Sequence, residues 1–584
     1  MKFKLKKFLL AAVNAKYIHS NLGIYSLMEY AKKKTAGQPE ILIEIGEYTI
    51  NHRMESILKD IYQRRPDVVG FSCYIWNISY VLELVRDLHK VLPDTDIWLG
   101  GPEVSYDAGR ILSQEPDVLG IMMGEGEETF ADLVLAYSRG QRSFAGMAGI
   151  AARDESGAVV EGKNRPLMDM NEIPFVYHDL NDFENRIIYY ESSRGCPFSC
   201  SYCLSSIDKS VRFRDVRLVK QELDFFLRNQ VKQVKFVDRT FNCKKSHATA
   251  IWKHILEHDN GITNFHFEIS ADLLGEEELN LLGRMRPGLI QLEIGVQSTN
   301  PDTIAEIRRK MDLKRLGEVV GRINGCHNIH QHLDLIAGLP YEGMERFKQS
   351  FDHVYSMRPE QLQLGFLKVL KGSHMQEMVS EYGLLYKGEP PYEVLSTKWL
   401  GYNDVLRLKA VEEMVEVYYN SGQFRHTLEL LEQKMDGAYH MYEKIALYYE
   451  ERGLSEVSVN RIARYEILYE FIGEEAVRDG FEELAEEFRD RLVYDLYLRE
   501  NVKSRPSFAR DQDGIKTKIR DFFIQEAREF KYLKEYEGYD SRQISKMAHI
   551  EGMRDGTMIL FDYKNRDPLT YNARTFLLTP DTKA

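Results

Sequence analysis

The sequence is poor in cysteine and has no long apolar run. Its 584 residues include six cysteines, too few for a disulfide scaffold. No apolar stretch approaches the roughly 18 residues that a membrane span needs. The basic start MKFKLKKFLLAAVN holds only a short apolar run, FLLAAV, without a small-residue cleavage site. It therefore predicts a buried strand rather than a signal peptide, in a cytoplasmic protein without membrane contacts.

Positive charge is also scarce. Lys and Arg number 77 against 90 Asp and Glu, a net charge of −13, which argues against broad binding of nucleic acid. Apolar residues make up 43% and charged residues 29%, as in globular proteins. At roughly 150 residues per domain, the length predicts three to four domains.

Residues 1–143 alternate short β-rich runs, such as FLLAAV, DVVGFSCYIW and TDIWLGG, with amphipathic helical stretches. Alternation with almost wholly apolar strands predicts a Rossmann-like, doubly wound parallel sheet. Glycines and polar residues follow the strands, where such sheets bind ligands, although any one glycine could simply form a tight turn. The absence of G-x-G-x-x-G argues against a dinucleotide site.

Residues 144–180 predict a hairpin and linker, and residues 181–390 a partial (β/α)6 TIM-type barrel. Six β-rich runs alternate with helical stretches there, from RIIYYESSRG to QLQLGFLKVLKGS. Polar side chains at the strand ends would gather at one mouth, where barrel chemistry occurs: Asp238, Glu268, Gln297 and Asp334. Each carboxylate could instead cap a helix or form a structural ion pair.

Residues 391–584 predict a mostly α-helical domain, because their apolar spacing is helical and no long β-run occurs before the end. TMILFDYKNRDPLTYNARTFLL predicts a terminal hairpin. No fixed repeat period is present, and the many tyrosines at helical spacing favour core positions over a binding site.

Three of the six cysteines form the most specific motif, ESSRGCPFSCSYC. Cys196, Cys200 and Cys203 are spaced C-x3-C-x2-C directly after a predicted strand. Three thiolates can hold three irons of a cubane cluster and leave the fourth iron open. Structural zinc needs a fourth ligand, which no neighbouring His or Cys supplies. The motif predicts an open-site 4Fe-4S cluster.

This motif, with an aromatic residue before its last cysteine, resembles the signature of the radical SAM superfamily. The resemblance implies that the open iron binds S-adenosylmethionine (SAM), which is cleaved reductively to a 5′-deoxyadenosyl radical. It implies cofactor contacts at Tyr202, Asp238, Glu268, Gln297, Gly338 and Pro340. The superfamily's Gly-Gly-Glu after the second barrel strand is replaced by Val237-Asp238-Arg239.

The first domain is similar to the cobalamin-binding domain of one radical SAM class, through WLGGPEVSYD and MMGEGEETF. The similarity implies cobalamin contacts at Ser72, Tyr74, Gly100, Gly101, Glu103, Gly124, Glu125 and Glu127. The D-x-H-x-x-G motif that supplies a cobalt ligand in mutases is missing. His19 is a possible substitute, but a structural role is favoured, so we expect cobalt without a protein histidine and with Tyr74 or Trp76 at that face.

The two resemblances together imply an enzyme that methylates an unactivated carbon of a small molecule through methylcobalamin. A flavodoxin or ferredoxin would donate electrons. The alternatives are a radical ring contraction or cyclisation of the same class, and a cofactor-sensing regulator without turnover. The C-terminal region resembles an extension of unassigned function on one branch of this class, and no residue indicates the substrate.

Overall fold

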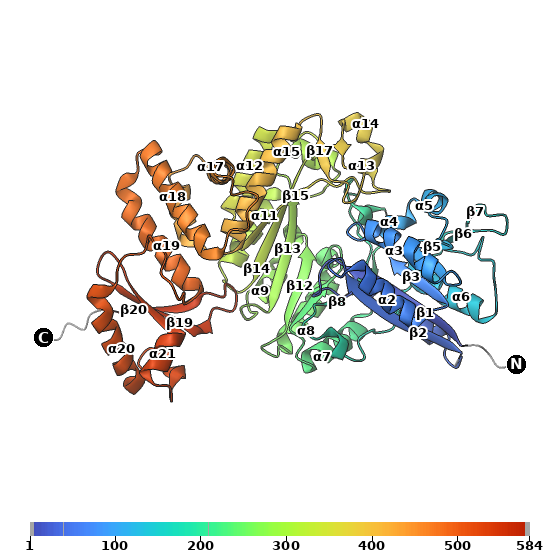
Figure 1. The fold of residues 1–584 in the computed structure, drawn as a ribbon, viewed down its shortest axis with the longest axis horizontal. Helices are drawn as coiled ribbons and strands as arrows, with labels where there is room; N and C mark the ends of the chain where they lie inside the picture. Colours follow the sequence, from blue (N-terminus) through green and yellow to red (C-terminus); the bar gives the residue numbers. More distant parts are fainter. Residues whose placement is uncertain (1–4, 39, 208, 579–584) are drawn as a thin grey trace.

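The computed structural model describes residues 5–38, 40–207 and 209–578 (Figure 1). Residues 1–4 and 579–584, at the ends of the predicted first and last domains, lie outside this range. The chain forms an N-terminal sheet, a central sheet and a C-terminal helical part, in that order across Figure 1.

The N-terminal sheet has seven strands. The first five are mutually parallel, and the last two extend the sheet as an antiparallel hairpin, the hairpin expected within residues 144–180. In order across the sheet, the strands are β2 (Ile41–Thr49), β1 (Lys6–Asn14), β3 (Val68–Ser72), β4 (Asp96–Gly100), β5 (Gly120–Met122), β6 (Ile150–Arg153) and β7 (Val159–Glu161).

Both faces of this sheet are covered by helices. Phe8 and Leu10 of β1 belong to one core, and Leu9 and Ala11 to the opposite core. The helices are α1 (Leu22–Lys34) and α6 (Gly126–Ser138) on the first face, and α2 (Met54–Arg64), α3 (Ile78–Val91), α4 (Pro102–Ser105) and α5 (Ala108–Gln114) on the second. Burial of alternate residues on both sides explains why the strands are almost wholly apolar.

The central sheet has six parallel strands and confirms the predicted partial barrel. In order across the sheet they are β8 (Ile188–Tyr190), β11 (Gln233–Phe236), β12 (Asn264–Ile269), β13 (Ile290–Gln297), β14 (His330–Ala337) and β15 (Gln361–Phe366). Its connections contain α7 (Val216–Arg228), α8 (Lys245–Glu257), α9 (Glu276–Leu282), α10 (Pro301–Glu306), α11 (Leu313–Asn324) and α12 (Met344–Ser356).

The two faces of the central sheet differ in polarity. Along β13, Ile290 and Leu292 are fully buried in the core, whereas Gln291 and Glu293 between them are half-buried. Because side chains alternate along a strand, Glu293 belongs to the inner face of the barrel, and that face is polar.

The C-terminal part is mostly helical, as predicted, and closes with a three-stranded antiparallel sheet. It follows α13 (His374–Glu377), α14 (Val379–Tyr382), β16 (Leu385–Tyr386) and β17 (Val394–Ser396). Its elements are α15 (Tyr402–Met414), a π-helical turn (Val415–Asn420), α16 (Arg425–Glu432), α17 (Ala438–Glu451), α18 (Arg461–Asp479), α19 (Ala485–Arg499), α20 (Lys516–Glu529), α21 (Ser541–Met547), β18 (Ala548–Gly552), β19 (Met558–Arg566) and β20 (Ala573–Leu578). The predicted hairpin is β19 and β20; the short strand β18 was not predicted.

The outer parts pack on different sides of the central sheet (Figure 1). The C-terminal part contacts α12 and β15, where the Asn420 side chain hydrogen-bonds to the backbone of Leu362. The N-terminal part meets the opposite edge, where His19 forms a β-bridge with Ile187 next to β8. Within the described ranges, no helix is long and apolar enough to cross a membrane.

Candidate active site

A cavity of about 670 Å³ lies between the carboxyl ends of the strands of the N-terminal and central sheets. From the N-terminal part it is lined by Asn14, Ala15, His19, Ser20, Asn21, Leu22, Gly23, Ser26, Tyr74, Trp76, Glu125 and Glu127. From the central part it is lined by Tyr189, Glu191, Ser193, Arg194, Gly195, Ser205, Arg212, Lys235, Val237, Arg239 and Glu268. Ligands bind at this end of parallel sheets, so the cavity is the candidate active site.

The three clustered cysteines lie in one loop at the edge of this cavity. The loop connects β9 (Ser193–Arg194) to β10 (Arg212–Phe213), which pair as antiparallel strands. Cys196 and Cys200 are buried, and Cys203 is half-buried. The described residues include two groups whose ligand atoms lie within 4.8 Å of one another, and these thiols form neither of them. Their wider separation suits a cluster, in which each thiolate binds a different iron.

Backbone contacts hold the cluster loop in place. A Cβ at Gly195 would lie 2.1 Å from the carbonyl oxygen of Ser210, and Gly195 has a φ of 96°, so only glycine fits before Cys196. Ser201 donates its N–H to the carbonyl of Ile307 at 2.9 Å. The Arg309 guanidinium lies 3.9 Å from the Cys200 sulfur, where its charge favours a thiolate.

Asp238 lies behind the cluster loop rather than at the cavity wall. It is completely buried, and its oxygens accept hydrogen bonds from the N–H of Ser192 at 3.0 Å and from the hydroxyls of Ser192 and Ser193 at 2.7 and 2.5 Å. Burial raises the pKa of Asp238 to about 6, against the hydrogen bonds that lower it. Its neighbours Val237 and Arg239 line the cavity instead. Direct SAM contact by Asp238 stays a prediction, and its observed contacts position the cluster loop.

Glu268 and Gln297 lie at the carboxyl ends of the neighbouring barrel strands β12 and β13. Glu268 lines the cavity, and its pKa is raised to about 7, first by burial and then by the charge of Glu293. Gln297 has a φ of 73°, uncommon for a residue with a Cβ, and no described residue hydrogen-bonds to its buried Oε1. A Cβ at Gly295 would lie 2.3 Å from the Gln297 amide nitrogen, so this glycine makes room for the amide.

Of three further SAM candidates, Tyr202 lies in the cluster loop, and Gly338 and Pro340 follow β14. The Tyr202 hydroxyl accepts a hydrogen bond from Arg309 at 3.4 Å, and burial raises the pKa of Tyr202. Gly338 has a φ of 89°, and a Cβ there would lie 2.8 Å from Val394. The carbonyl of Pro340 accepts a hydrogen bond from Thr303 at 2.8 Å. These contacts shape the loop's surroundings; cofactor contact by these residues stays a prediction.

An aromatic pair forms part of the cavity wall on the N-terminal side. The rings of Tyr74 and Trp76 are stacked, with centroids 4.4 Å apart and planes at 8°, and Trp76 is 45% exposed. Such a flat, exposed apolar surface suits a macrocycle.

Glu125 and Glu127 bind arginines of the cluster loop's hairpin. Glu125 accepts hydrogen bonds from both Nη atoms of Arg212, at 2.6 and 3.0 Å, and Glu127 accepts one from Arg194 at 2.8 Å. Burial opposes ionisation of both carboxyls, but these arginines hold their pKa values below the usual range. The two glutamates therefore join the N-terminal part to the cluster loop.

The remaining cobalamin candidates are not among the residues that line the cavity. Ser72 accepts a hydrogen bond from Asn21 at 3.0 Å, and Glu103 forms a buried ion pair with Lys371 at 2.7 Å. A Cβ at Gly101 would lie 2.5 Å from the carbonyl of Cys73, which requires glycine there. Gly100 ends β4, and Gly124, with a φ of 71°, follows β5. Their contact with cobalamin stays a prediction.

His19 lines the cavity at the junction of the two parts. Its Nδ1 lies 2.6 Å from the Tyr189 hydroxyl, and burial together with Lys16 and Lys235 lowers the pKa of His19. A neutral ring with a defined hydrogen bond agrees with a structural role, and whether its other nitrogen binds cobalt stays a prediction.

Several cavity residues were not among the predicted site residues. Lys235 lies on β11, on the same face as the predicted Glu268 of neighbouring β12, and Arg239 follows Asp238. Arg194 and Arg212 flank the cysteines in RGCPFSC and VRFRDV, but their acidic partners are 67 and 87 residues earlier in the chain. The alternation of KQVKFVDR would have shown that Lys235, Val237 and Arg239 share one face.

The site fits the predicted cofactors. The loop that supplies three thiols beside Arg309 contributes Gly195 and Ser205 to the cavity wall, and the aromatic pair lines the same cavity. Gln297, which does not line the cavity, offers an unpartnered buried oxygen. Iron–sulfur clusters take thiolate ligands, and a flat corrin suits a broad apolar wall.

Comparisons with known families divide the chain in the same way. Residues 9–134 match the B12 binding domain, residues 190–354 the radical SAM superfamily, and residues 380–566 a protein family of unknown function, DUF4080. The central match gives the chain a radical SAM domain. More particularly, the chain carries a B12-binding domain before the radical SAM domain and a DUF4080 domain after it.

Curated relatives are matched over part of their length. The cobalamin-dependent radical SAM methyltransferase TokK of Streptomyces tokunonensis is 25% identical over 341 residues, 55% of this chain and 50% of the relative. An anaerobic magnesium-protoporphyrin IX monomethyl ester cyclase of Synechocystis sp. is 28% identical over 278 residues, 45% of this chain and 54% of the relative. The chain thus spans about half the length of these relatives.

A solved structure shares the fold over most of the chain. The cobalamin-dependent S-adenosylmethionine radical enzyme OxsB, with aqua-cobalamin and SAM bound, superposes with a TM-score of 0.59 and is 15% identical in sequence. The alignment covers 84% of this chain and 83% of that one. The likeness shows that the arrangement of sheets is shared.

Proposed function

We propose that this protein is a cobalamin-dependent radical SAM methyltransferase that acts on an unactivated carbon of a small molecule. The observation that carries the proposal is the single cavity shared by the strand ends of the B12-binding domain and the barrel, with the cluster loop at its edge. The methyltransferase relative supports it.

Bound in this cavity, the cluster and SAM supply a carbon radical, and methylcobalamin supplies the methyl group. The protein's part is to hold these groups together and to keep water out. Cys196, Cys200 and Cys203 hold the cluster, and Gln297 with Glu268 orients SAM. The Tyr74–Trp76 pair packs against the corrin. A flavodoxin or ferredoxin as electron donor, and a cytoplasmic location, belong to the same proposal.

A second candidate is a radical rearrangement or cyclisation without methyl transfer. The sequence similarity to the magnesium-protoporphyrin ester cyclase favours this candidate, since the alignment covers about half of that relative, as it does for the methyltransferase. The regulator without turnover has no comparable support, because both relatives described above are enzymes.

The two reactions differ in their use of SAM. Methyl transfer consumes one molecule of SAM to re-methylate cobalt, giving S-adenosylhomocysteine, and cleaves another to 5′-deoxyadenosine. We expect the by-products in equal amounts when reduced holoenzyme is incubated with its substrate and SAM carrying a deuterated methyl group, and we expect the label in the product. Substrate-dependent 5′-deoxyadenosine without S-adenosylhomocysteine or label transfer would contradict methylation and favour rearrangement.

A further inference from the structure

Four ionisable side chains meet on the inner face of the barrel, below the cavity. They are His266 on β12, Glu293 on β13, and His332 and Asp334 on β14, and we call them the barrel cluster. Glu293 and His332 are direct partners in the parallel register of β13 and β14. His332 and Asp334 are two residues apart on one strand and therefore share a face. Asp334 was predicted at a strand end, but it lies within β14.

The atoms of the barrel cluster are close together without being hydrogen-bonded to one another. His266 Nε2 lies 3.0 Å from Glu293 Oε2, and His332 Nε2 lies 3.1 Å from Asp334 Oδ1. Nevertheless, both ring nitrogens and Asp334 Oδ1 are buried without a hydrogen-bond partner of suitable geometry among the described residues. His266 and His332 are each only 7% exposed. Buried polar atoms rarely remain without a partner, so this arrangement requires an explanation.

A shared ion explains why His332 Nε2 and Asp334 Oδ1 lie close together without a hydrogen bond. The ligand atoms of Glu293, His332 and Asp334 all lie within 4.8 Å of one another. Ligands held at about 2.0–2.2 Å from one ion are about 3–3.6 Å apart and point at the ion, not at each other. Imidazole nitrogens with carboxylate oxygens are typical ligands of zinc and of other divalent first-row metals.

The charge around the barrel cluster also favours a cation. Glu268, Glu293 and Asp334 lie on this inner face, and the Lys235 ammonium, 3.0 Å from Glu293 Oε2, directly pairs with only one of them. A buried group of carboxylates is stable only when cations or protons balance it. A cation held by His332 and Asp334 would balance the Asp334 carboxylate, which Lys235 does not pair.

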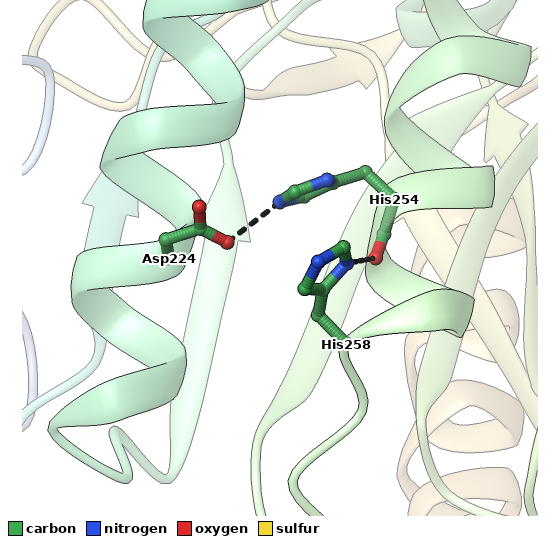
Figure 2. Close-up of side chains that lie close together, drawn as sticks. All are labelled: Asp224, His254 and His258. Carbon is green, nitrogen blue, oxygen red and sulfur yellow. Dashed lines mark hydrogen bonds and ion pairs between the residues drawn. The ribbon is translucent and has the colours of Figure 1, made fainter.

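The other close group of possible ligands differs from the barrel cluster in its hydrogen bonds. Asp224 lies on α7, His254 on α8 and His258 directly after α8 (Figure 2). His254 Nε2 donates to Asp224 at 2.7 Å, and His258 Nδ1 donates to the His254 carbonyl at 2.9 Å. Because hydrogen bonds within the protein already account for these contacts, this outer group needs no ion and provides a matched control.

We propose that the barrel cluster binds one divalent transition-metal ion of the zinc type, through Glu293, His332 and Asp334, with His266 beside them next to Glu293. Lys235 and Glu268, which adjoin the cluster, line the cavity, so the ion lies at the barrel end of the candidate active site. There it can bind an oxygen or nitrogen of a molecule held in the cavity. The proposal concerns these side chains alone and does not depend on methyl transfer.

The test uses full-length protein with its iron–sulfur cluster assembled, so that Cys196, Cys200 and Cys203 are not free to bind zinc. After treatment with a chelator that spares the cluster, equilibrium dialysis against zinc should give about one zinc ion per chain. The double variant His266→Gln/His332→Gln should lose this ion, whereas His254→Gln/His258→Gln should keep it. Absence of zinc in the parent protein, or its loss from the outer variant alone, would overturn the proposal.

A second measurement identifies the ligands of the ion by spectroscopy. Cobalt(II) added to the same cluster-loaded protein should be displaced by one equivalent of zinc and should show ligand-field bands of nitrogen and oxygen coordination. Glu293→Gln should shift these bands or abolish them. Intense sulfur-to-cobalt charge transfer, or bands unchanged in Glu293→Gln, would place the ion elsewhere and refute the proposal.

Discussion

The guanidinium of Arg194 donates hydrogen bonds to both oxygens of Glu127, at 2.8 Å to Oε1 and 3.4 Å to Oε2. Glu127 begins α6 of the B12-binding domain, and Arg194 stands two residues before Cys196. One ion pair therefore joins the B12-binding domain to the hairpin that carries the three cysteines.

Breaking this pair should destabilise the chain. Glu127→Gln removes the charge of this side chain but keeps its shape. Arg194 then retains its ion pairs with Glu191 and Glu125. We expect a loss of about 1–3 kcal/mol, because the remaining charge stays buried. Thermal unfolding of the protein without cofactors measures the effect. Glu128→Gln is the matched control: its side chain is 40% exposed, and it should change stability by less than about 0.5 kcal/mol. Equal melting temperatures for the two variants would show that the link is unimportant.

The cluster ligands give a second prediction. Anaerobically reconstituted protein should contain about four irons per chain, and Cys196→Ala, Cys200→Ala and Cys203→Ala should each abolish the cluster absorbance. Cys243 is the sharper control, because it is half-buried and lies close to Cys196. Burial raises the pKa of Cys243 most, and the charge of Cys196 raises it further. Cys243→Ala and Cys326→Ala should keep the iron. Iron lost from either control, with the three motif cysteines intact, would mean that the ligands are wrongly assigned.

Asp238 gives a prediction about pH. Burial raises its pKa in the folded chain to about 6, from 3.8. Between these values the folded state keeps a proton that the unfolded state has released, so the contribution of Asp238 to stability falls as pH rises from about 4 to about 6. The fall is about 3 kcal/mol and is complete above pH 6.

Asp238→Asn removes this titration. Melting temperatures of parent and variant, measured without cofactors between pH 4 and 7, should diverge in one direction, with the parent losing stability relative to the variant as pH rises. Asp272→Asn, a change at a half-buried aspartate that accepts a serine hydroxyl, should follow the parent. Parallel curves for the parent and Asp238→Asn would contradict the assigned titration.

Most of the fold could be predicted from the sequence, because the strands that build it have strong local signals. β1 buries alternate residues in opposite cores, and its apolar run FLLAAV is a direct consequence. β18 had no such signal, since AHIEG is short and polar, and it is recruited to the C-terminal sheet by pairing with β19.

The site was predictable where chemistry lies within one segment, as in the three cysteines. It was not predictable where partners are distant in the chain. Glu103 pairs with Lys371, and Glu127 with Arg194, and neither contact leaves a periodic signal. Asp238 shows a further limit: its position after a barrel strand suggested a cavity residue, but its side chain turns to the serines that precede the cluster loop.

Variants of Gln297 distinguish a role of this side chain in SAM binding from a role in backbone stability. Its φ of 73° strains any residue with a Cβ, so Gln297→Gly should be about 1 kcal/mol more stable than Gln297→Ala. If the unpartnered Oε1 contacts SAM, both variants should weaken SAM binding about equally, by roughly tenfold. Equilibrium binding of SAM to cluster-loaded protein, with melting curves beside it, checks both. If Gln297→Gly binds SAM as tightly as the parent and only Gln297→Ala binds it more weakly, the affinity follows backbone stability and the Gln297 amide makes no contact with SAM.

The last prediction concerns the cobalt face near His19. Its Nδ1 is hydrogen-bonded to the Tyr189 hydroxyl, and burial raises the pKa of Tyr189 to about 12, so the phenol keeps its proton. If that proton is donated to Nδ1, the neutral ring carries its own proton on Nε2 and has no lone pair there for cobalt. We therefore expect the paramagnetic resonance spectrum of the reduced, cobalamin-loaded protein to lack nitrogen splitting. His19→Ala should leave the spectrum and the cobalamin content unchanged, whereas Tyr74→Ala/Trp76→Ala should lower the content by removing the stacked wall of the cavity. Nitrogen splitting in the parent that disappears in His19→Ala would instead establish His19 as the cobalt ligand, with Tyr189 orienting its ring.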